Sequence, residues 1–403
     1  MDISIDVDLV RRDLAQLVSY ASVGGSESEV AVQRWCAATL QGLGLEVDLW
    51  RLDLDDLRAD PDYPGEEVER EEAWGCVGVS GGPGTPALIL NGHVDVVPPG
   101  EHEWWTGADP WDLHEHDDEW FGRGVCDMKG GVVAILAAVR AVGHQLTRPF
   151  AVHTVIGEED GGIGTFGTLR HGHTGEACLI AEPTDGQIVA ANAGALTFRL
   201  ELRGLATHGS LAGLGVSTVD MLESVRTSLR RLDDKRNVSP PAPFGERPWP
   251  ISTGIVNAGA WASTVPDYLV AEGRYGVMPG ESFADAMAEF EQAVREADDP
   301  WLREHPVEVS WPGGRFAAGA LPSGHPFGDE VATAVQAAGG DRPRLVGAPY
   351  GSDLRQYAAT GVPTVQFGPG TIQNAHAIDE HVAIDEVVRC AETYAHLLVS
   401  RCG

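Results

Sequence analysis

Hydrophobic and polar positions in the first half of the chain follow helical and strand periods in turn. Apolar residues recur at helical spacing over residues 30–40, and Gly42 and Gly44 then end this helix. Ser26 and Glu29 have the spacing of a capping box ahead of it. Further on, apolar runs predict buried strands at 87–90, 151–156 and 177–180 and a helix at 132–142. This order predicts an α/β domain with a largely parallel sheet.

The segment that follows has a different pattern. It predicts half-exposed strands at 197–202 and 267–275, an amphipathic helix at 219–232 and a proline-rich loop at 234–250. Helices at 327–338 and 384–399 and a strand at 362–367 then resume the earlier pattern. We therefore expect a first domain, 1–192 and 313–403, interrupted by a smaller α+β domain, 193–312.

Composition is that of a soluble globular protein with a strong negative charge. A chain of 403 residues exceeds the roughly 250 to 300 residues of one core, which agrees with two domains. The 28 basic and 60 acidic residues give a net charge of −32, which repels nucleic acid and anionic membranes. The acidic N-terminus lacks a secretory signal, so we expect a cytoplasmic protein. The six cysteines are scattered singly and are expected to be buried thiols.

Two polar motifs near the first strands are candidates for metal binding. His93 and Asp95 lie two residues apart on an extended segment, so Asp95 can hold the second ring nitrogen of a metal-bound His93. A strand-end histidine with ordinary hydrogen bonds explains this pair equally well. Asp127 lies in a glycine-rich loop that lacks the spacing of a phosphate-binding loop. Its glycines permit tight turns that direct Asp127 into a pocket, or they form a structural turn only.

Carboxylates and a histidine follow three later strands. Glu158, Glu159 and Asp160 come directly after the 151–156 strand, where adjacent buried carboxylates are costly unless cations offset them. Glu182 follows the 177–180 strand, and His376 follows the 362–367 strand. A solvated acidic turn is the alternative for the first group. Together, five strand ends deliver His93, Asp127, Glu159, Glu182 and His376, a set that suits Zn²⁺ or a related divalent ion.

Two other histidine tracts are not expected to bind metal. His114 and His116 flank an Asp-Asp turn and are typical of the exposed face of a hairpin. His171 and His173 are interpreted as part of a polar loop. We expect no strand to deliver further ligands to either tract.

The motifs GHVDVVP, GRGVCDMKGG, GEED, AEPT and NAHAIDE resemble those of the dinuclear zinc peptidases and deacylases, over nearly the whole chain. This family includes acetylornithine deacetylase, succinyl-diaminopimelate desuccinylase, aminoacylase and carboxypeptidase G. The resemblance implies two divalent ions, Zn²⁺ first, with Co²⁺ and Mn²⁺ as alternatives. It also divides the ligands: His93 and Glu182 on one ion, Glu159 and His376 on the other, and Asp127 bridging both.

The resemblance also implies roles around the ions and in the insertion. Asp95 orients His93, and Glu158 is the base that moves a proton from the metal-bridging water to the leaving amine. The 193–312 insertion corresponds to a lid that also forms a homodimer. The implied substrate contacts are His208 at the scissile carbonyl, Arg274 at a substrate carboxylate, the loop at Gly351, and Ser263, where many relatives carry asparagine.

The function predicted from these residues is hydrolysis of the amide bond of an N-acyl amino acid or a related small molecule. A dipeptidase or carboxypeptidase of the same family is the first alternative. A metal-containing binding protein without activity is an alternative of another class, although the presence of Glu158 argues against it.

Overall fold

The computed structural model describes residues 3–82, 84–107 and 109–403, and these form two compact units. Unit 1 comprises the residues up to Ala191 together with Ala320–Val346 and Ser352–Gly403. Unit 2 comprises Asn192–Gly319 and Gly347–Gly351. The segment that we expected to form the insertion, 193–312, falls within unit 2.

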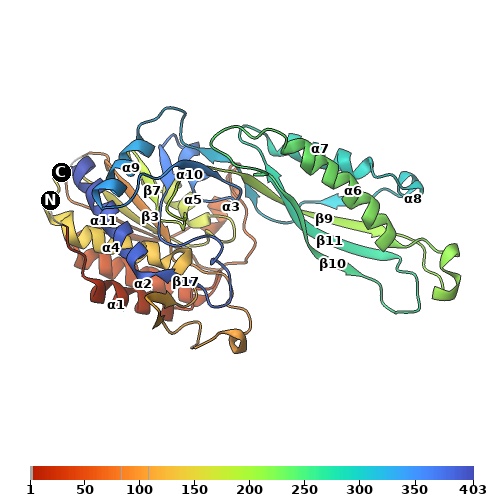
Figure 1. The fold of residues 1–403 in the computed structure, drawn as a ribbon, viewed down its shortest axis with the longest axis horizontal. Coiled ribbons are helices and arrows are strands. Elements are labelled where there is room, and N and C mark those ends of the chain that lie inside the picture. Colours follow the sequence, from red (N-terminus) through yellow and green to blue (C-terminus); the bar gives the residue numbers. More distant parts are fainter. Residues whose placement is uncertain (1–2, 83, 108) are drawn as a thin grey trace. The chain divides into compact units, whose positions relative to one another are not determined.

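Unit 1 is built around a mixed sheet whose middle strands are parallel (Figure 1). Its strand order is β1 (Glu46–Arg51), β2 (Trp74–Val79), β6 (Ala151–Val155), β3 (Ile89–His93), β7 (Cys178–Ile180), β16 (Thr364–Gln366) and β8 (Ile188–Asn192). β3 pairs in parallel with β6 and β7, and β7 with β16, whereas the outer pairs are antiparallel. The prediction of an α/β fold with a parallel central sheet is confirmed. The carboxyl ends of β6, β3 and β7 lie together at one edge of this sheet.

Helices cover the sheet of unit 1. They are α1 (Val7–Ser19), α2 (Glu27–Gly42), α3 (Leu54–Ala59), α4 (Gly130–Val142), α5 (Ile163–Arg170), α9 (Phe327–Ala337), α10 (Leu354–Ala359) and α11 (Ile384–Cys402). The apolar helix α4 packs against both α1 and α11 (Figure 1). A Cβ on Gly131 would lie 2.1 Å from the Ala181 carbonyl oxygen. Glycine therefore lets the start of α4 approach the chain just after β7.

The predicted capping box of α2 does not form. Ser26 occupies the N-cap position, but its hydroxyl makes no capping hydrogen bond. The Glu29 carboxylate accepts a hydrogen bond from the Gly25 amide at 2.8 Å and pairs with the buried Arg70 at 2.9 Å. Arg70 also pairs with Asp160 at 2.6 Å. Glu29 thus takes part in a long-range ion-pair network that joins α2 to the loop after β6. No local sequence pattern could predict this pairing.

A small sheet and the cysteines complete unit 1. The sheet consists of β4 (His114–His116), β5 (Glu119–Phe121) and β17 (His381–Ala383), and the hairpin predicted around His114 and His116 is confirmed. All six cysteines are buried free thiols, as expected. Among the described residues, no helix is long and apolar enough to cross a membrane.

His153 is a fully buried histidine on β6. Its Nδ1 atom lies 2.8 Å from the Tyr357 hydroxyl. Burial, and then the charge of nearby His173, lowers the pKa of His153 from 6.5 to about 3. In the unfolded chain the same imidazole takes up a proton near pH 6.5. The unfolded state therefore binds more protons between these values, and acid destabilises the fold.

We expect His153→Gln to reduce this acid sensitivity. Below pH 6.5 the wild-type protein should lose about 1.4 kcal/mol more unfolding free energy per pH unit than the variant does. Chemical denaturation at pH 7, 6 and 5 measures the difference. His144→Gln, at an exposed position, is the matched control and should follow the wild type. Parallel pH curves for wild type and His153→Gln would show that His153 is not the neutral buried group described.

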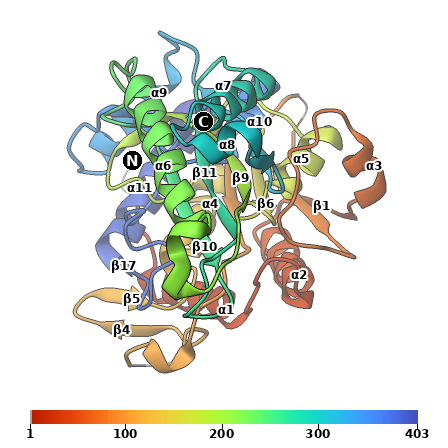
Figure 2. The ribbon, with the colours of Figure 1, turned by 90° about the vertical axis from the view of Figure 1, so that its right-hand side faces the viewer.

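Unit 2 is an antiparallel sheet with helices on one face (Figures 1 and 2). The strand order is β10 (Ile251–Ala258), β11 (Tyr268–Val277), β9 (Gly194–Arg203) and β12 (Glu308–Ser310), with β13 (Arg315–Phe316) also paired to β9. The helices are α6 (Thr218–Arg236), α7 (Phe283–Arg295) and α8 (Pro300–Glu304). Phe198, Tyr275 and Phe290 lie in its core. The short strands β14 (Gly319–Ala320) and β15 (Leu345–Ala348) lie where the chain passes between the units.

Candidate metal centre

Five side chains of unit 1 form two adjoining groups with the spacing of metal ligands. The first group is His93, Asp127 and Glu182, and the second is Asp127, Glu159 and His376. Within each group the ligand atoms lie within 4.8 Å of one another. These are the five residues that the sequence indicated as ligands, and Asp127 belongs to both groups.

Three of the five side chains come from neighbouring parallel strands. His93 is the last residue of β3, Glu159 follows β6, and Glu182 lies two residues beyond β7. Because the carboxyl ends of parallel strands lie at the same edge of the sheet, these side chains converge.

The expectation that all five ligands follow strand ends was wrong for Asp127. Asp127 lies in the turn Val125–Lys129 that leads directly into α4, and its backbone angles are not helical. Gly122 and Gly124, before this turn, have positive φ and permit the reversal that points the carboxylate at His93. His376 lies in the long loop between β16 and β17, with φ of 60°, a left-handed conformation uncommon for histidine. Such backbone conformations concentrate at functional sites.

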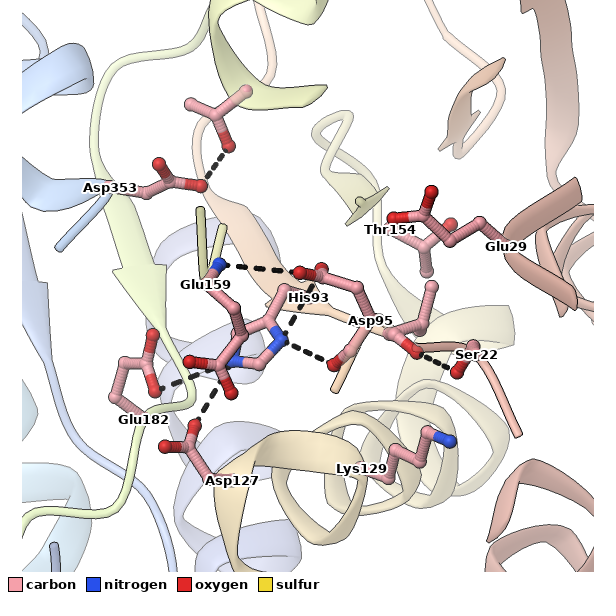
Figure 3. Close-up of polar contacts among 12 residues, drawn as sticks. Ser22, Glu29, His93, Asp95, Asp127, Lys129, Thr154, Glu159, Glu182 and Asp353 are labelled. Atoms are coloured by element: carbon pink, nitrogen blue, oxygen red, sulfur yellow. Dashed lines mark hydrogen bonds and ion pairs between the residues drawn. The ribbon is translucent and has the colours of Figure 1, made fainter. Parts of the chain in front are cut away.

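The two oxygens of Asp127 face different histidines. Oδ1 lies 3.0 Å from Nε2 of His93, and Oδ2 lies 3.5 Å from Nε2 of His376. Glu182 lies 3.9 Å from Nε2 of His93 on the first side, and Glu159 lies 2.9 Å from Nε2 of His376 on the other. Figure 3 shows Asp127 and Glu182 converging on His93. One carboxylate placed between two such groups has the geometry to contact two cations.

Asp95 lies behind His93. Nδ1 of His93 is 3.0 Å from the Asp95 carbonyl oxygen and 3.5 Å from its carboxylate. The other carboxylate oxygen accepts a hydrogen bond from the Glu159 amide at 3.2 Å (Figure 3). Asp95 therefore contacts the ring nitrogen opposite the ligand atom and also the backbone of a second ligand, as expected for a residue that orients His93.

The site holds more buried negative charge than its own cations offset. Burial, and then Asp127, raises the pKa of Glu159 to about 7 and that of Glu182 well above its usual range. Burial opposes protonation of His93, but hydrogen bonds with Asp127 and Asp95 raise its pKa overall. Oε1 of Glu159 is buried and has no hydrogen-bond partner in the part of the chain that the structure describes. Crowded carboxylates and an unpartnered buried oxygen fit a site that binds divalent cations.

Glu158 lies beside the two groups and belongs to neither. Burial, and then the nearby Asp353, raises its pKa well above the usual value for a carboxyl. Asp353 itself is buried and accepts a hydrogen bond from the Thr165 hydroxyl. Glu158 is thus a carboxylate with a high proton affinity next to a metal-ligand cluster, which is the property required of a proton carrier.

A sequence model of the peptidase family M20/M25/M40 matches residues 89–400. The chain belongs to this family. It is therefore a hydrolase of amide bonds that uses divalent metal ions, and the resemblance on which the prediction rested is confirmed.

Relatives of the M20/M25/M40 protein include deacylases and peptidases. It is 26% identical over 413 residues to an N-formyl-4-amino-5-aminomethyl-2-methylpyrimidine deformylase of Bacillus subtilis, covering 96% of this chain and 93% of the relative. It is 27% identical over 331 residues to an acetylornithine deacetylase of Proteus mirabilis, covering 80% and 81%. The crystal structure of a tripeptidase from Staphylococcus aureus has the same fold, with a TM-score of 0.73, 17% identity and 98% of each chain covered.

Glu380 is a residue of the M20/M25/M40 site that sequence reasoning missed, although it ends the NAHAIDE motif. Its buried carboxylate accepts hydrogen bonds from the amides of Gly124, Cys126 and Asp127 at 2.8 to 2.9 Å. It also pairs with Arg123 at 2.7 Å. Glu380 thus holds the turn that presents Asp127. The signal available in the sequence was an acidic residue four positions beyond His376.

We expect Glu380→Gln to weaken metal binding and activity by about 10- to 100-fold. A glutamine offers one acceptor oxygen where the glutamate offers two, and it turns an NH₂ group toward backbone donors. Metal affinity and kcat, measured together, check this expectation. Glu386→Gln is the control, because Glu386 accepts a single bond from the Gly370 amide in the same region. Equal metal affinity in wild type and Glu380→Gln would contradict the positioning role.

The predicted substrate contacts lie in unit 2. His208 pairs with Thr264 in an isolated bridge, and the Gly209 amide donates to the Ser263 carbonyl at 2.6 Å, so the structure brings His208 and Ser263 together. Arg274 on β11 donates to the Pro349 carbonyl at 2.8 Å, in the segment that contains Gly351. The four residues therefore form two pairs of neighbours within this unit.

Proposed function

We propose that the chain hydrolyses the amide bond of an N-acylated small molecule, an N-acyl amino acid or a related compound, and releases a carboxylate and an amine. The observation that carries this proposal is Asp127 shared between two ligand groups, with Glu158 beside them. Two relatives named for deformylation and deacetylation align over most of the chain and support the choice of an acyl group.

His93, Asp127, Glu182, Glu159 and His376 would hold two divalent cations, Zn²⁺ first, with Co²⁺ and Mn²⁺ as alternatives. When bound, such ions lower the pKa of a water molecule and stabilise negative charge on the substrate carbonyl oxygen. The nearby cations also counteract the upward pKa shifts of the carboxylates.

Glu158 is the residue proposed to move the proton. Its carboxylate accepts a proton from the attacking water and donates it to the leaving nitrogen, so the amine departs as a neutral group. Its burial beside Asp353 raises its proton affinity, which favours the first transfer, from the water to the carboxylate. Because Glu158 belongs to neither ligand group, proton transfer by its carboxylate does not compete with metal binding.

His208 and Arg274 are proposed to contact the substrate. Nδ1 of His208 accepts a hydrogen bond from the Ser210 amide at 3.2 Å, so the ring hydrogen is on Nε2. Nε2 can then donate to the scissile carbonyl oxygen, while Arg274 pairs with a substrate carboxylate. Ser263 and Gly351 would line the same region. We also propose that 193–312 acts as lid and dimerisation domain of a cytoplasmic homodimer.

A panel of substrates tests the proposal. Protein loaded with Zn²⁺ or Co²⁺ is assayed on N-formyl, N-acetyl and N-succinyl derivatives of amino acids and of aminomethyl heteroaromatics, and on dipeptides. We expect kcat/KM for the preferred acylated compound to exceed that for every dipeptide by at least about 10-fold, the equivalent of roughly 1.4 kcal/mol. A dipeptide as the best substrate would favour the peptidase alternative, and no hydrolysis at all would favour a binding protein.

A further inference from the structure

A third histidine-carboxylate group lies outside the dinuclear site. His171 and His173, in the loop after α5, both face Asp48 on the edge strand β1. One oxygen, Oδ2 of Asp48, is 3.2 Å from Nε2 of His171 and 3.0 Å from Nε2 of His173. The expectation that no strand delivers a partner to these histidines was wrong, because β1 supplies Asp48 from 125 residues away.

The spacing of this group matches that of the dinuclear centre in the same molecule. There, the closest nitrogen–oxygen pairs are 3.0 and 2.9 Å apart. Two ligand atoms about 2.1 Å from a common ion lie roughly 3.0 to 3.4 Å apart in octahedral or tetrahedral geometry. The two distances from Asp48 to its histidines therefore fall in the range expected between ligands of one ion.

The surrounding residues restrain the two imidazoles. Trp50, two residues along β1 from Asp48, stacks on His171 with ring centroids 4.1 Å apart and an interplanar angle of 9°. The Trp50 ring also lies against His173, with ring centroids 5.2 Å apart. The side chains of Asp48 and His171 are 45% and 42% exposed, so an ion has access from solvent. Because the two histidines are already restrained and remain accessible, they can bind a metal ion with little loss of side-chain conformational entropy.

A cavity beside the group supplies an independent observation. It has a volume of about 390 Å³ and is lined by His153 and His173, among others. His153 is completely buried, and among the described residues its Nε2 atom has no hydrogen-bond partner. The His153 and His173 rings lie 6.1 Å apart. An unpartnered buried imidazole nitrogen next to the group indicates a polar occupant, such as an ion with its coordinated water.

We propose that Asp48, His171 and His173 bind one first-row divalent transition ion, of the class of Zn²⁺ or Ni²⁺. Two imidazoles and one carboxylate suit such ions, whereas Ca²⁺ and Mg²⁺ require oxygen ligands. The ion links the edge strand β1 to the loop after α5 and leaves positions open to water. The site shares no residue with the dinuclear centre, so its existence is independent of the proposed function.

Calorimetric titration of the Zn²⁺-loaded, desalted holoenzyme with further Zn²⁺ tests this site. We expect the wild type to take up one additional ion per chain and the double variant His171→Asn, His173→Asn to lose that uptake. Its content of tightly bound metal and its turnover should be unchanged. The double variant His114→Asn, His116→Asn is the matched control, because this histidine pair has no third ligand among the described residues, and it should keep the uptake.

A second readout uses Trp50. Ni²⁺, which quenches tryptophan emission at short range, should lower the fluorescence of the wild-type holoenzyme and have at least 2-fold less effect on Trp50→Phe and on Asp48→Asn. The proposal fails if the wild type takes up no additional ion. It also fails if the His171→Asn, His173→Asn variant takes up as much as the wild type, or if the control variant loses the uptake as well.

Discussion

Glu158→Gln is expected to lower kcat by about 10²- to 10⁴-fold, the range supplied by a positioned proton carrier. Glutamine has nearly the same shape as glutamate but cannot accept a proton from the attacking water. Because Glu158 lies in neither ligand group, the variant should bind the same number of ions as the wild type. Single-turnover rates and elemental analysis of the same samples measure both quantities.

The adjacent residue separates the role of base from that of ligand. Glu159→Gln should lose bound metal together with activity, because Glu159 lies 2.9 Å from His376 in the second ligand group. Loss of activity with full metal content is therefore the signature of position 158 alone. Turnover by Glu158→Gln within about 10-fold of the wild type would be incompatible with its assignment as the proton carrier.

Asp127→Asn should have the second large effect, loss of both ions. An asparagine keeps the shape of the side chain but removes the charge that serves the two groups at once. We expect activity to fall by about 10³-fold or more, since the ions supply several kcal/mol of charge stabilisation. Metal content after dialysis, measured with residual activity, checks this result.

His376→Ala is the matched comparison for Asp127→Asn. His376 belongs to the second group only, so this variant should keep the ion held by His93, Asp127 and Glu182. A graded outcome is expected, with two ions in the wild type, one in His376→Ala and none in Asp127→Asn. Retention of both ions by Asp127→Asn would mean that the carboxylate is not shared.

The sequence was most informative where side chains follow regular elements. His93, Glu159 and Glu182 leave parallel strands that end at one edge of a sheet, so strand prediction alone brings them together. The apolar run over 132–142 likewise predicted the buried helix α4, because a helix that is apolar on every side is buried in a core.

Long-range pairing and irregular backbone were not predictable in this way. Glu380 contacts the turn at Asp127 across 253 residues, and Glu29 pairs with Arg70 across 41. Asp48 meets His173 across 125 residues. Side-chain periodicity reports only which face of an element is buried, so it carries no information on which distant polar groups become neighbours.

The most direct test of the dinuclear centre is X-ray diffraction from crystals of the Zn²⁺-loaded protein, recorded on both sides of the zinc absorption edge. We predict two strong anomalous peaks in unit 1, one in contact with His93, Asp127 and Glu182 and the other with Asp127, Glu159 and His376. A single peak there, or zinc that does not contact Asp127 from both sides, would contradict the shared-carboxylate site on which the proposed hydrolysis depends.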